Sequence, residues 1–306
     1  MKQVLFYYPQ HFNRSARGTN PFFDPLIETC RKEGVSFDVM EEPDGGTDKP
    51  RNPEAKKADA FYWTVTGIRK ALSIMMPRRD FFERERIAGR IFNVMTFGHF
   101  RYHTYVTISG SMYHFFAALN PHARVYDMQH GILYKHHPTF FEEQNLRLRA
   151  QFYNPQLHFM FWGEGYRKCF IRGEESVLRG RDHVTGFPVD TGAHGRPTDH
   201  SASSLIVVSL QLTHSVDMPE RERMKRAIWR FLEEIEPLGM EIILKNHPRY
   251  NNCIPLDDML AHFPQVKLVD KPLGELAPRT RIHVTLSSTT AFEFADFGVP
   301  TYFLND

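Results

Sequence analysis

Two polar segments in the last quarter of the chain have the residue types and positions that ligand chemistry needs. Lys245-Asn246-His247-Pro248 follows the apolar run 242–244, and Ser287-Ser288-Thr289-Thr290 follows the apolar run 282–286. In an α/β sheet, a buried parallel strand brings polar groups to its carboxyl edge, where such folds bind ligands. The first segment offers a cation and an imidazole, and the second offers hydroxyl groups at the start of a predicted helix, where N–H groups attract anions. Together they predict a site for a phosphate-bearing ligand, such as a nucleotide.

Each of these residues also has a plain structural interpretation. His247 with its proline is compatible with a turn that ends a strand, and the Ser/Thr cluster with a simple helix cap. We favour binding, with Lys245 and His247 donating to phosphate and the Ser287–Thr289 hydroxyls forming a second anion site. Gln211 follows the first predicted strand of the second half and is expected to approach the same phosphates.

The first half of the chain offers candidates for acid–base chemistry. Gln129-His130-Gly131 directly follows the predicted strand 124–128. His130 is the leading candidate for a general base or for a donor to phosphate, and Gly131 lets the backbone turn sharply. Asp127, which shares a strand face with Gln129 rather than with His130, is a further catalytic candidate. The structural alternative is a histidine held by the loop backbone.

Three more residues of the first half complete the predicted site. Glu164, at the end of the next predicted strand, is a rival base. Arg14 and Arg17 follow the first strand, where a doubly wound domain faces its ligand, and with Gln129 they are predicted to hold an acceptor. A solvated loop is the alternative for the two arginines.

The histidine pairs of the sequence do not predict a metal centre. His99 and His103 are four residues apart and His136 and His137 are adjacent, but no carboxylate or cysteine motif accompanies them. Zinc needs a third and a fourth ligand in a defined geometry. We therefore expect a metal-independent site and no bound cofactor.

Composition narrows the class of protein further. The 306 residues are 42% apolar and 24% charged with a net charge of +2, which argues against a nucleic-acid binder held mainly by phosphate contacts. No apolar run approaches the ~20 residues that span a bilayer, and the three cysteines form no paired motif. These features predict a cytoplasmic protein, and the basic and aromatic stretch 97–105 leaves open a peripheral contact with a membrane surface or a partner protein.

Strands and helices are predicted to alternate in two blocks that a polar linker separates. In the first block, we expect helices over 21–34, 112–119 and most of 55–91 with a break at Pro77, and a further helix after Gly165. The predicted strands of both blocks are 4–8, 35–40, 105–109, 124–128, 157–162, 205–210, 241–244, 266–269, 282–286 and 301–304. A second-block helix is predicted over 219–238. The pattern predicts an α/β fold of two doubly wound, Rossmann-type domains, 1–190 and 204–306, that face each other across a cleft and are joined by the linker 191–203. The second block ends directly after its last strand, which predicts a short or truncated second domain.

Five motifs in this order resemble the bacterial surface-polysaccharide glycosyltransferases of the GT-B fold. The capsule-synthesis family that includes Kdo transferases is the most similar, and the polysialyltransferases and CDP-glycerol glycerophosphotransferases are more distant. The resemblance covers about residues 100–306. The motifs are Gln129-His130-Gly131, Phe161-Trp162-Gly163-Glu164, Gly186-Phe187-Pro188-Val189-Asp190, Lys245-Asn246-His247-Pro248, and Ser287-Ser288-Thr289-Thr290 with Glu293.

The resemblance implies a nucleotide-activated sugar as donor, bound mainly by the second domain, and a glycan or glycolipid acceptor bound mainly by the first. It assigns His247, with Lys245 beside it, to the donor nucleotide and its phosphate, the Ser/Thr motif to donor phosphate, and Glu293 to ribose hydroxyls. A CMP-linked donor is favoured on the resemblance alone, together with an inverting, metal-independent transfer and a peripheral location at the inner membrane beside other polysaccharide-assembly proteins. Two alternatives stay open: a nucleotide-sugar 2-epimerase of the same fold, and an inactive GT-B module that binds glycan or a partner transferase.

Overall fold

The computed structural model describes most of the chain in two compact units. The described residues up to Pro188 form the first unit and those from Val189 onward form the second. Most of the predicted linker lies outside the described residues. These are 3–15, 17–44, 50–108, 110, 112–131, 140–142, 148–171, 178–189, 200, 202–212, 217–247 and 254–304.

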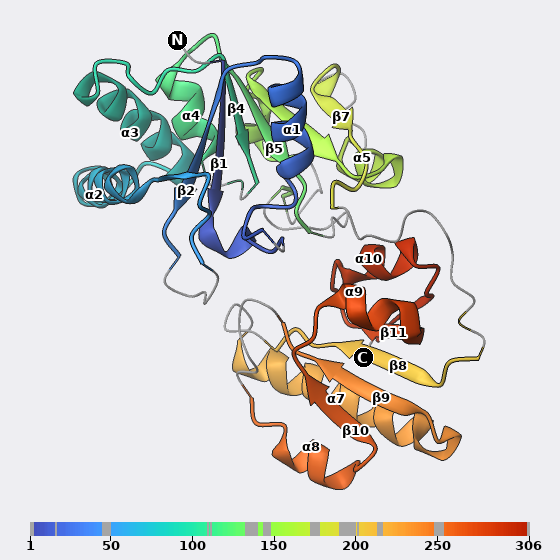
Figure 1. The fold of residues 1–306 in the computed structure, drawn as a ribbon. Coiled ribbons are helices and arrows are strands. Elements are labelled where there is room, and N and C mark those ends of the chain that lie inside the picture. The colour runs from blue at the N-terminus through green and yellow to red at the C-terminus, as the bar shows by residue number, and fades with distance from the viewer. Residues whose placement is uncertain are drawn as a thin grey trace. The chain divides into compact units, whose positions relative to one another are not determined.

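The first unit is built on a parallel sheet of seven strands (Figure 1). Their order is β3-β2-β1-β4-β5-β6-β7, so the strand order reverses between β1 and β4, as in doubly wound folds. The strands are β1 (Val4–Pro9), β2 (Phe37–Glu42), β3 (Lys56–Lys57), β4 (Thr104–Thr107), β5 (Arg124–Met128), β6 (Leu157–Phe161) and β7 (Asp182–Val184).

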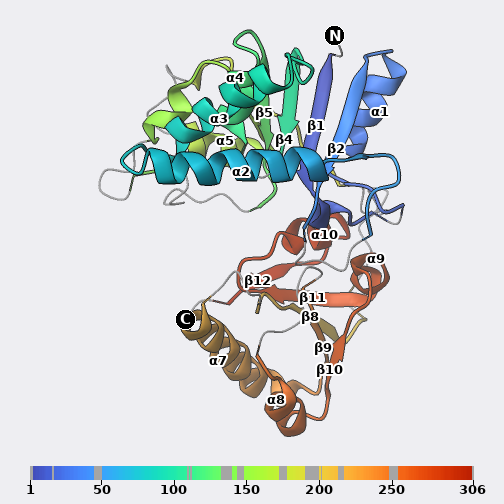
Figure 2. The same ribbon diagram turned by 90° about the vertical axis from the view of Figure 1, so that its left-hand side faces the viewer.

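Helices cover both faces of this sheet, and aromatic side chains fill the space beneath them. Figure 2 shows α1 on the side of the sheet away from α3, α4 and α5. Gly89 lets α3 approach α4 closely, because a Cβ there would lie 2.5 Å from the backbone oxygen of Phe115. The helices are α1 (Asp24–Lys32), α2 (Asp59–Met75), α3 (Phe81–Met95), α4 (Tyr113–Leu119) and α5 (Glu164–Ile171), with short 3₁₀ turns at Gln10–Phe12 and Ala150–Tyr153.

The second unit repeats the same plan with five parallel strands. Their order is β10-β9-β8-β11-β12, and the reversal lies between β8 and β11. The strands are β8 (Leu205–Ser209), β9 (Glu241–Lys245), β10 (Val266–Val269), β11 (Thr280–Thr285) and β12 (Thr301–Phe303). The helices are α7 (Met218–Ile235), α8 (Asp257–His262), α9 (Leu273–Leu276) and α10 (Thr290–Asp296), with 3₁₀ turns at Glu236–Leu238 and Ala277–Arg279.

Two separate cores hold this second sheet. Ile206, Val208 and Leu244 belong to an aliphatic core on one face, and Val207 and Ile243 pack on the other face with α9 and α10. The alternation along each strand therefore decides which side chains meet at the carboxyl edge. None of the described helices is long and apolar enough to cross a membrane.

The predicted fold class is confirmed, and most predicted elements are present. The strands at 124–128 and 266–269 have the predicted bounds, and the break at Pro77 separates α2 from α3. The predicted helix 21–34 is shorter and starts only at Asp24, because the chain first makes a turn in which Asn20 accepts hydrogen bonds from the backbone of Phe23 and Asp24. The sequence interpretation missed β3, β7, α8 and α9, which are two to six residues long.

Candidate functional site

The reversal of strand order in the second unit brings together two predicted site residues. Gln211 follows β8 and Ser287 follows β11, and these strands are neighbours in the sheet. The side-chain oxygen of Gln211 accepts hydrogen bonds from both the backbone N–H and the hydroxyl of Ser287, each at 2.9 Å. Ligands of doubly wound sheets bind outside the carboxyl ends of the strands at such a reversal. This pair therefore marks the place where a ligand of the second unit is expected.

Lys245 lies beside this pair, in a row of polar residues across three strands. The register places Lys245 of β9 opposite Ser209 of β8, and Ser209 opposite Thr285 of β11. All three are buried, and Lys245 is only 8% exposed. They lie on the face of Val207 and Ile243, under α9 and α10. A buried cation beside hydroxyl groups is suited to bind an anionic ligand at the carboxyl edge of this sheet.

His283 supports this row from below and was not predicted from the sequence. Its ring is fully buried, stacks on Phe294 with centroids 4.0 Å apart, and bonds Ser209 Oγ at 2.9 Å and Thr301 Oγ1 at 3.0 Å. Burial lowers the pKa of His283 to about 3, so the imidazole is neutral. It is a structural histidine that joins three strands. In the sequence, only its position within the mainly apolar strand segment 282–286 indicated that His283 is buried.

The hydroxyl cluster lies directly before α10. Helix α10 begins at Thr290, and Thr289 caps it without a side-chain hydrogen bond. Ser288 is buried; its N–H donates to Thr285 Oγ1 at 3.2 Å, and its hydroxyl accepts from the N–H of Thr290 at 3.3 Å. The cluster therefore lies at the start of a helix, as predicted, and its two serines form the turn between β11 and α10.

The two remaining donor candidates, His247 and Glu293, are half-buried residues of the same unit. His247 comes two residues after Lys245, beyond the end of β9, where the N–H of Asn246 still donates to the backbone oxygen of Val269 at 3.3 Å. Glu293 lies in the first turn of α10. Pro248 lies outside the described residues, so the His-Pro turn is described only up to its histidine.

In the first unit, His130 stands at the carboxyl edge as predicted. It follows β5, is exposed, and its ring meets the ring of Phe12 edge to face with centroids 5.7 Å apart. Phe12 belongs to the turn after β1, so two separate strand ends meet at this histidine. The position is open to a substrate, and its role as a base stays a prediction.

Gln129, the neighbour of His130, has a structural task. Its side-chain nitrogen donates to the backbone oxygen of Gly131 at 2.8 Å, and its side-chain oxygen accepts from the N–H of Trp162 at 3.0 Å. The residue is 5% exposed. Both the nitrogen and the oxygen of the Gln129 side chain form hydrogen bonds to backbone groups. Gln129 therefore links the ends of β5 and β6 and is not placed to hold an acceptor.

Asp127 is buried beneath α4 rather than presented at the edge. Thr107 Oγ1 donates to it at 3.3 Å, and the backbone N–H of Gly110 and the hydroxyl of Tyr113 lie nearby. Burial raises the pKa of Asp127 to about 7, although these hydrogen bonds oppose the shift. The carboxyl thus keeps its proton to a higher pH than an ordinary aspartate, but it sits inside the unit.

Glu164 is engaged in an ion pair that weakens it as a base. Arg167, three residues later on α5, donates to both of its carboxylate oxygens at 2.9 and 2.7 Å and reaches Asp182 of β7 at 2.6 Å. The hydrogen bonds from Arg167 lower the pKa of Glu164. A carboxylate with a lowered pKa has little tendency to take a proton, so this ion pair argues against Glu164 as the base.

The two arginines after β1 differ in their surroundings. Arg17 lies 3.7 Å from Asp24 and 3.4 Å from Glu28, so it forms ion pairs with acidic residues of α1. Arg14 is exposed, donates to the backbone oxygen of His11 at 3.2 Å and stacks over Phe12 at 5.5 Å. Arg14 therefore lies near the ring that contacts His130, and Arg17 does not share that arrangement.

No group of three or more His, Cys, Asp or Glu side chains within the described part of the chain has the arrangement of a metal site. His99 and His103 lie in the loop before β4, and the pair at 136 and 137 lies outside the described residues. The predicted metal independence stays a prediction.

Comparison with known proteins identifies the fold. No family model matches the chain, and comparison with curated proteins by sequence finds no match. Among solved structures, the chain is similar to a UDP-GlcNAc 2-epimerase from Neisseria meningitidis bound to UDP-GlcNAc, with a TM-score of 0.59 and 14% identity over 99% of this chain and 83% of that one.

A galactosyltransferase and a protein solved with UDP are similar to nearly the same degree. The lipopolysaccharide outer core galactosyltransferase WaaB gives a TM-score of 0.52 at 8% identity over 98% of this chain and 80% of that one. The Anabaena protein Alr3699/HepE, solved in complex with UDP, gives 0.52 at 12% identity over 98% and 79%. At such identities the likeness concerns the fold alone, and it shows that this chain has the two-unit, Rossmann-like architecture of GT-B structures.

Proposed function

We propose that the chain is a glycosyltransferase that moves a sugar from a nucleotide-activated donor to a glycan or glycolipid acceptor in the assembly of a surface polysaccharide. The observation that supports this most directly is the cluster at the strand reversal of the second unit, where Gln211 and Ser287 meet beside Lys245. A CMP-linked donor is our first choice, on the motif resemblance.

The chemistry of this cluster suits a departing nucleotide. Glycosyl transfer leaves negative charge on the donor phosphate, and charged or polar donors placed there in advance stabilise the transition state. Lys245 and His247 supply the cation and the imidazole, and Ser287 and Ser288 supply hydroxyl and N–H groups. His130 of the first unit is the proposed base that deprotonates the acceptor hydroxyl.

An epimerase that acts on a nucleotide sugar is the second candidate, because several of the similar structures are UDP-GlcNAc 2-epimerases with TM-scores of 0.55 to 0.59. Such an enzyme needs carboxylates at the reacting sugar for proton abstraction. In the described first unit, Asp127 is buried and Glu164 is paired with Arg167. These two carboxylates are therefore poorly placed for proton abstraction, and for this reason we prefer transfer to epimerisation.

A binding screen followed by product analysis tests the proposal. CMP, CDP, UDP, GDP and their sugars are added at a hundredfold their Kd, where a ligand of the native state adds about 2.7 kcal/mol of stability. Incubation with UDP-GlcNAc alone then separates the candidates, because an epimerase yields a new sugar nucleotide without an acceptor. Absence of any nucleotide binding would refute both enzymes.

The same assay tests the predicted absence of a metal. Transfer is expected to continue in excess EDTA, because Lys245 and His247 are assigned to the leaving group. Turnover that disappears with EDTA and returns with Mg²⁺ or Mn²⁺ would contradict this assignment and would leave the nucleotide site itself intact.

A further inference from the structure

The helical hairpin of α2 and α3 exposes an unusual number of apolar side chains. Within the described chain, eight of the fifteen exposed large apolar residues lie between positions 63 and 97. Concentrated exposure of this kind marks a surface that meets a membrane or another molecule. The residues are Trp63, Ile74, Met75, Phe81, Ile91, Val94, Met95 and Phe97.

Several of these residues lie at one end of the hairpin. The two helices pack together, and the ring of Phe61 in α2 lies 5.0 Å from the ring of Phe92 in α3. The first turn of α2 therefore contacts the last turn of α3. Trp63 is 65% exposed and Val94 is 74% exposed, so both point away from the core at this end.

Phe97, which follows α3, is the most informative of the group. Its side chain is 95% exposed, and its backbone has a φ of 47°. It occupies the position after the helix end where glycine or asparagine is usual, and the next N–H, that of Gly98, bonds the backbone oxygen of Asn93 at 2.9 Å. A large aromatic residue in this conformation costs folding stability and gains no packing. A contact made outside the folded chain would explain its presence.

The hairpin and the segments on either side of it are basic. Residues 56–101, which run from β3 through α2 and α3 to the loop before β4, hold ten Lys and Arg against four Asp and Glu, a net +6, whereas the whole chain has only +2. Lys70 lies one turn before Ile74 on α2, and Arg90 adjoins Ile91 on α3; all four are exposed. Apolar anchors among basic residues complement an anionic lipid surface.

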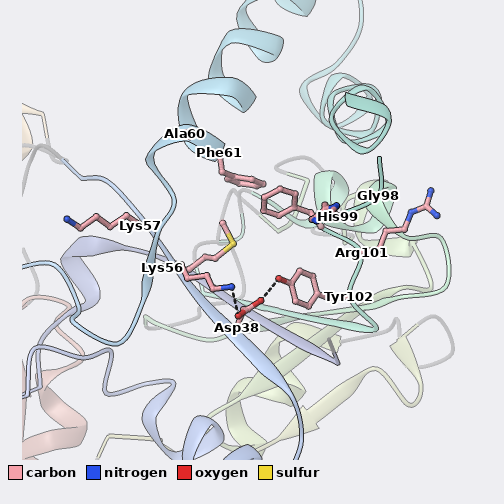
Figure 3. A pocket seen from close by; sticks show the side chains of 11 residues that line it. Asp38, Lys56, Lys57, Ala60, Phe61, Gly98, His99, Arg101 and Tyr102 are labelled. Carbon is pink, nitrogen blue, oxygen red and sulfur yellow. Dashed lines mark hydrogen bonds and ion pairs between the residues drawn. The ribbon is translucent and has the colours of Figure 1, made fainter. Parts of the chain in front are cut away.

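A pocket of about 750 Å³ lies at this end of the hairpin (Figure 3). The first turn of α2 and the loop after Phe97 form part of its wall, and β2 and β3 form another part. Lys56 bonds Asp38 at 2.8 Å and offsets its charge, whereas Lys57 and Arg101 extend away from Asp38 on opposite sides of the pocket. The rim is therefore cationic and suits a phosphate headgroup.

We propose that the α2–α3 hairpin docks the protein on an anionic phospholipid bilayer. Trp63, Val94, Met95 and Phe97 enter the headgroup region, the basic residues contact lipid phosphates, and the pocket accepts a headgroup. A second copy of the chain is a poorer occupant, because two faces of net +6 repel one another. The inference is independent of the proposed function, since it uses none of the candidate site residues.

Flotation with vesicles tests the inference. The intact protein should float with vesicles of phosphatidylcholine containing 30% phosphatidylglycerol and much less with pure phosphatidylcholine, and added salt should weaken the binding. Lys70→Glu with Arg90→Glu should lower the partition coefficient at least 20-fold, since each basic residue contributes roughly fivefold.

Phe97→Asn gives a test that protein unfolding cannot imitate. Asparagine tolerates the left-handed backbone, so the variant should melt ~2–4 °C higher than the parent while its vesicle binding falls roughly tenfold or more. A merely structural role would change stability and leave vesicle binding as it was.

The matched control is Leu238→Ser with Leu268→Ser, which removes two exposed apolar residues of the second unit and should leave flotation unchanged. Equal loss in the control, or full binding by Phe97→Asn, would overturn the proposal. So would a protein that is dimeric in light scattering without vesicles and becomes monomeric on Phe97→Asn, because the hairpin would then be a contact between copies.

Discussion

The carboxyl edges of the two sheets use their polar residues in different ways. At the edge of the second unit, polar side chains from neighbouring strands meet one another, as Gln211 meets Ser287 beside Lys245. At the edge of the first unit, Gln129 is bonded to backbone at both ends and Glu164 is held by Arg167. A polar residue after a strand can serve a ligand or the strand end itself.

This difference between the two edges separates motifs that could bind a ligand from motifs that hold the chain in place. In the second unit the shared contacts lie at the reversal of strand order, which is where we propose that the ligand binds. In the first unit the same type of motif mostly fixes loops, and His130, next to Phe12, is the exception. Variants that separate these two uses test the comparison directly.

The largest effect is expected for His130→Ala. If this histidine is the base, turnover should fall by ~10²–10⁴, because a positioned proton acceptor contributes about that much. Nucleotide affinity, measured by calorimetry, should stay close to that of the parent. Turnover equal to that of the parent would show that His130, like Gln129, has only a structural role at the carboxyl edge of the first unit.

Asp127→Asn should change how stability depends on pH. The folded-state pKa of about 7 lies above the ordinary aspartate value, so the native state keeps a proton that the unfolded chain loses. The parent should therefore lose stability as pH rises from ~4 to ~7, by up to ~4 kcal/mol, and the loss should level off above that range.

The asparagine variant cannot titrate and should lack this slope. Urea unfolding at pH 4.5, 6 and 8 measures both proteins, and parallel pH profiles would show that Asp127 does not titrate as its burial requires. The comparison concerns stability alone and holds whatever the substrate is.

His247→Ala should weaken nucleotide binding by ten- to a hundredfold, since a hydrogen bond to a charged group is worth ~1.5–3 kcal/mol. Gln129→Ala is the counterpart from the other edge: it should lower the melting temperature and leave nucleotide affinity unchanged. The reverse pattern, with affinity lost in Gln129→Ala and kept in His247→Ala, would invert the comparison between the two edges.

The smallest effect is expected for Glu164→Gln. The carboxylate is exposed and its pKa is lowered by Arg167, so it is a weak base. Turnover should remain within about twofold of the parent. A loss comparable to that of His130→Ala would make Glu164 the base and would show that its pairing with Arg167 opens in the working enzyme.

Much of the fold could be predicted because periodicity and turn residues are local signals. The segments 124–128 and 266–269 were predicted as strands with the observed bounds, and Pro77 marked the helix break. The two-residue β3 and the four-residue α9 are too short to leave a periodic pattern, and pairing and packing alone define them.

The site could be predicted only in part, because strand order is a tertiary property. The sequence placed Gln211 and Ser287 at strand ends but did not indicate that β8 and β11 are neighbours, so their contact was not foreseen. The pairing of Glu164 with Arg167 could be predicted from the sequence, since side chains three residues apart on a helix are neighbours. The buried position of Asp127 could not be predicted in this way, because it depends on the packing of α4.

The contact between Gln211 and Ser287 joins residues that are 76 positions apart in the chain. Closing so long a loop delays a contact during folding, because its entropy cost precedes any gain. Interactions that form after the transition state alter the unfolding rate and hardly alter the folding rate. A nucleotide bound at this reversal should therefore lengthen the lifetime of the native state without hastening its formation.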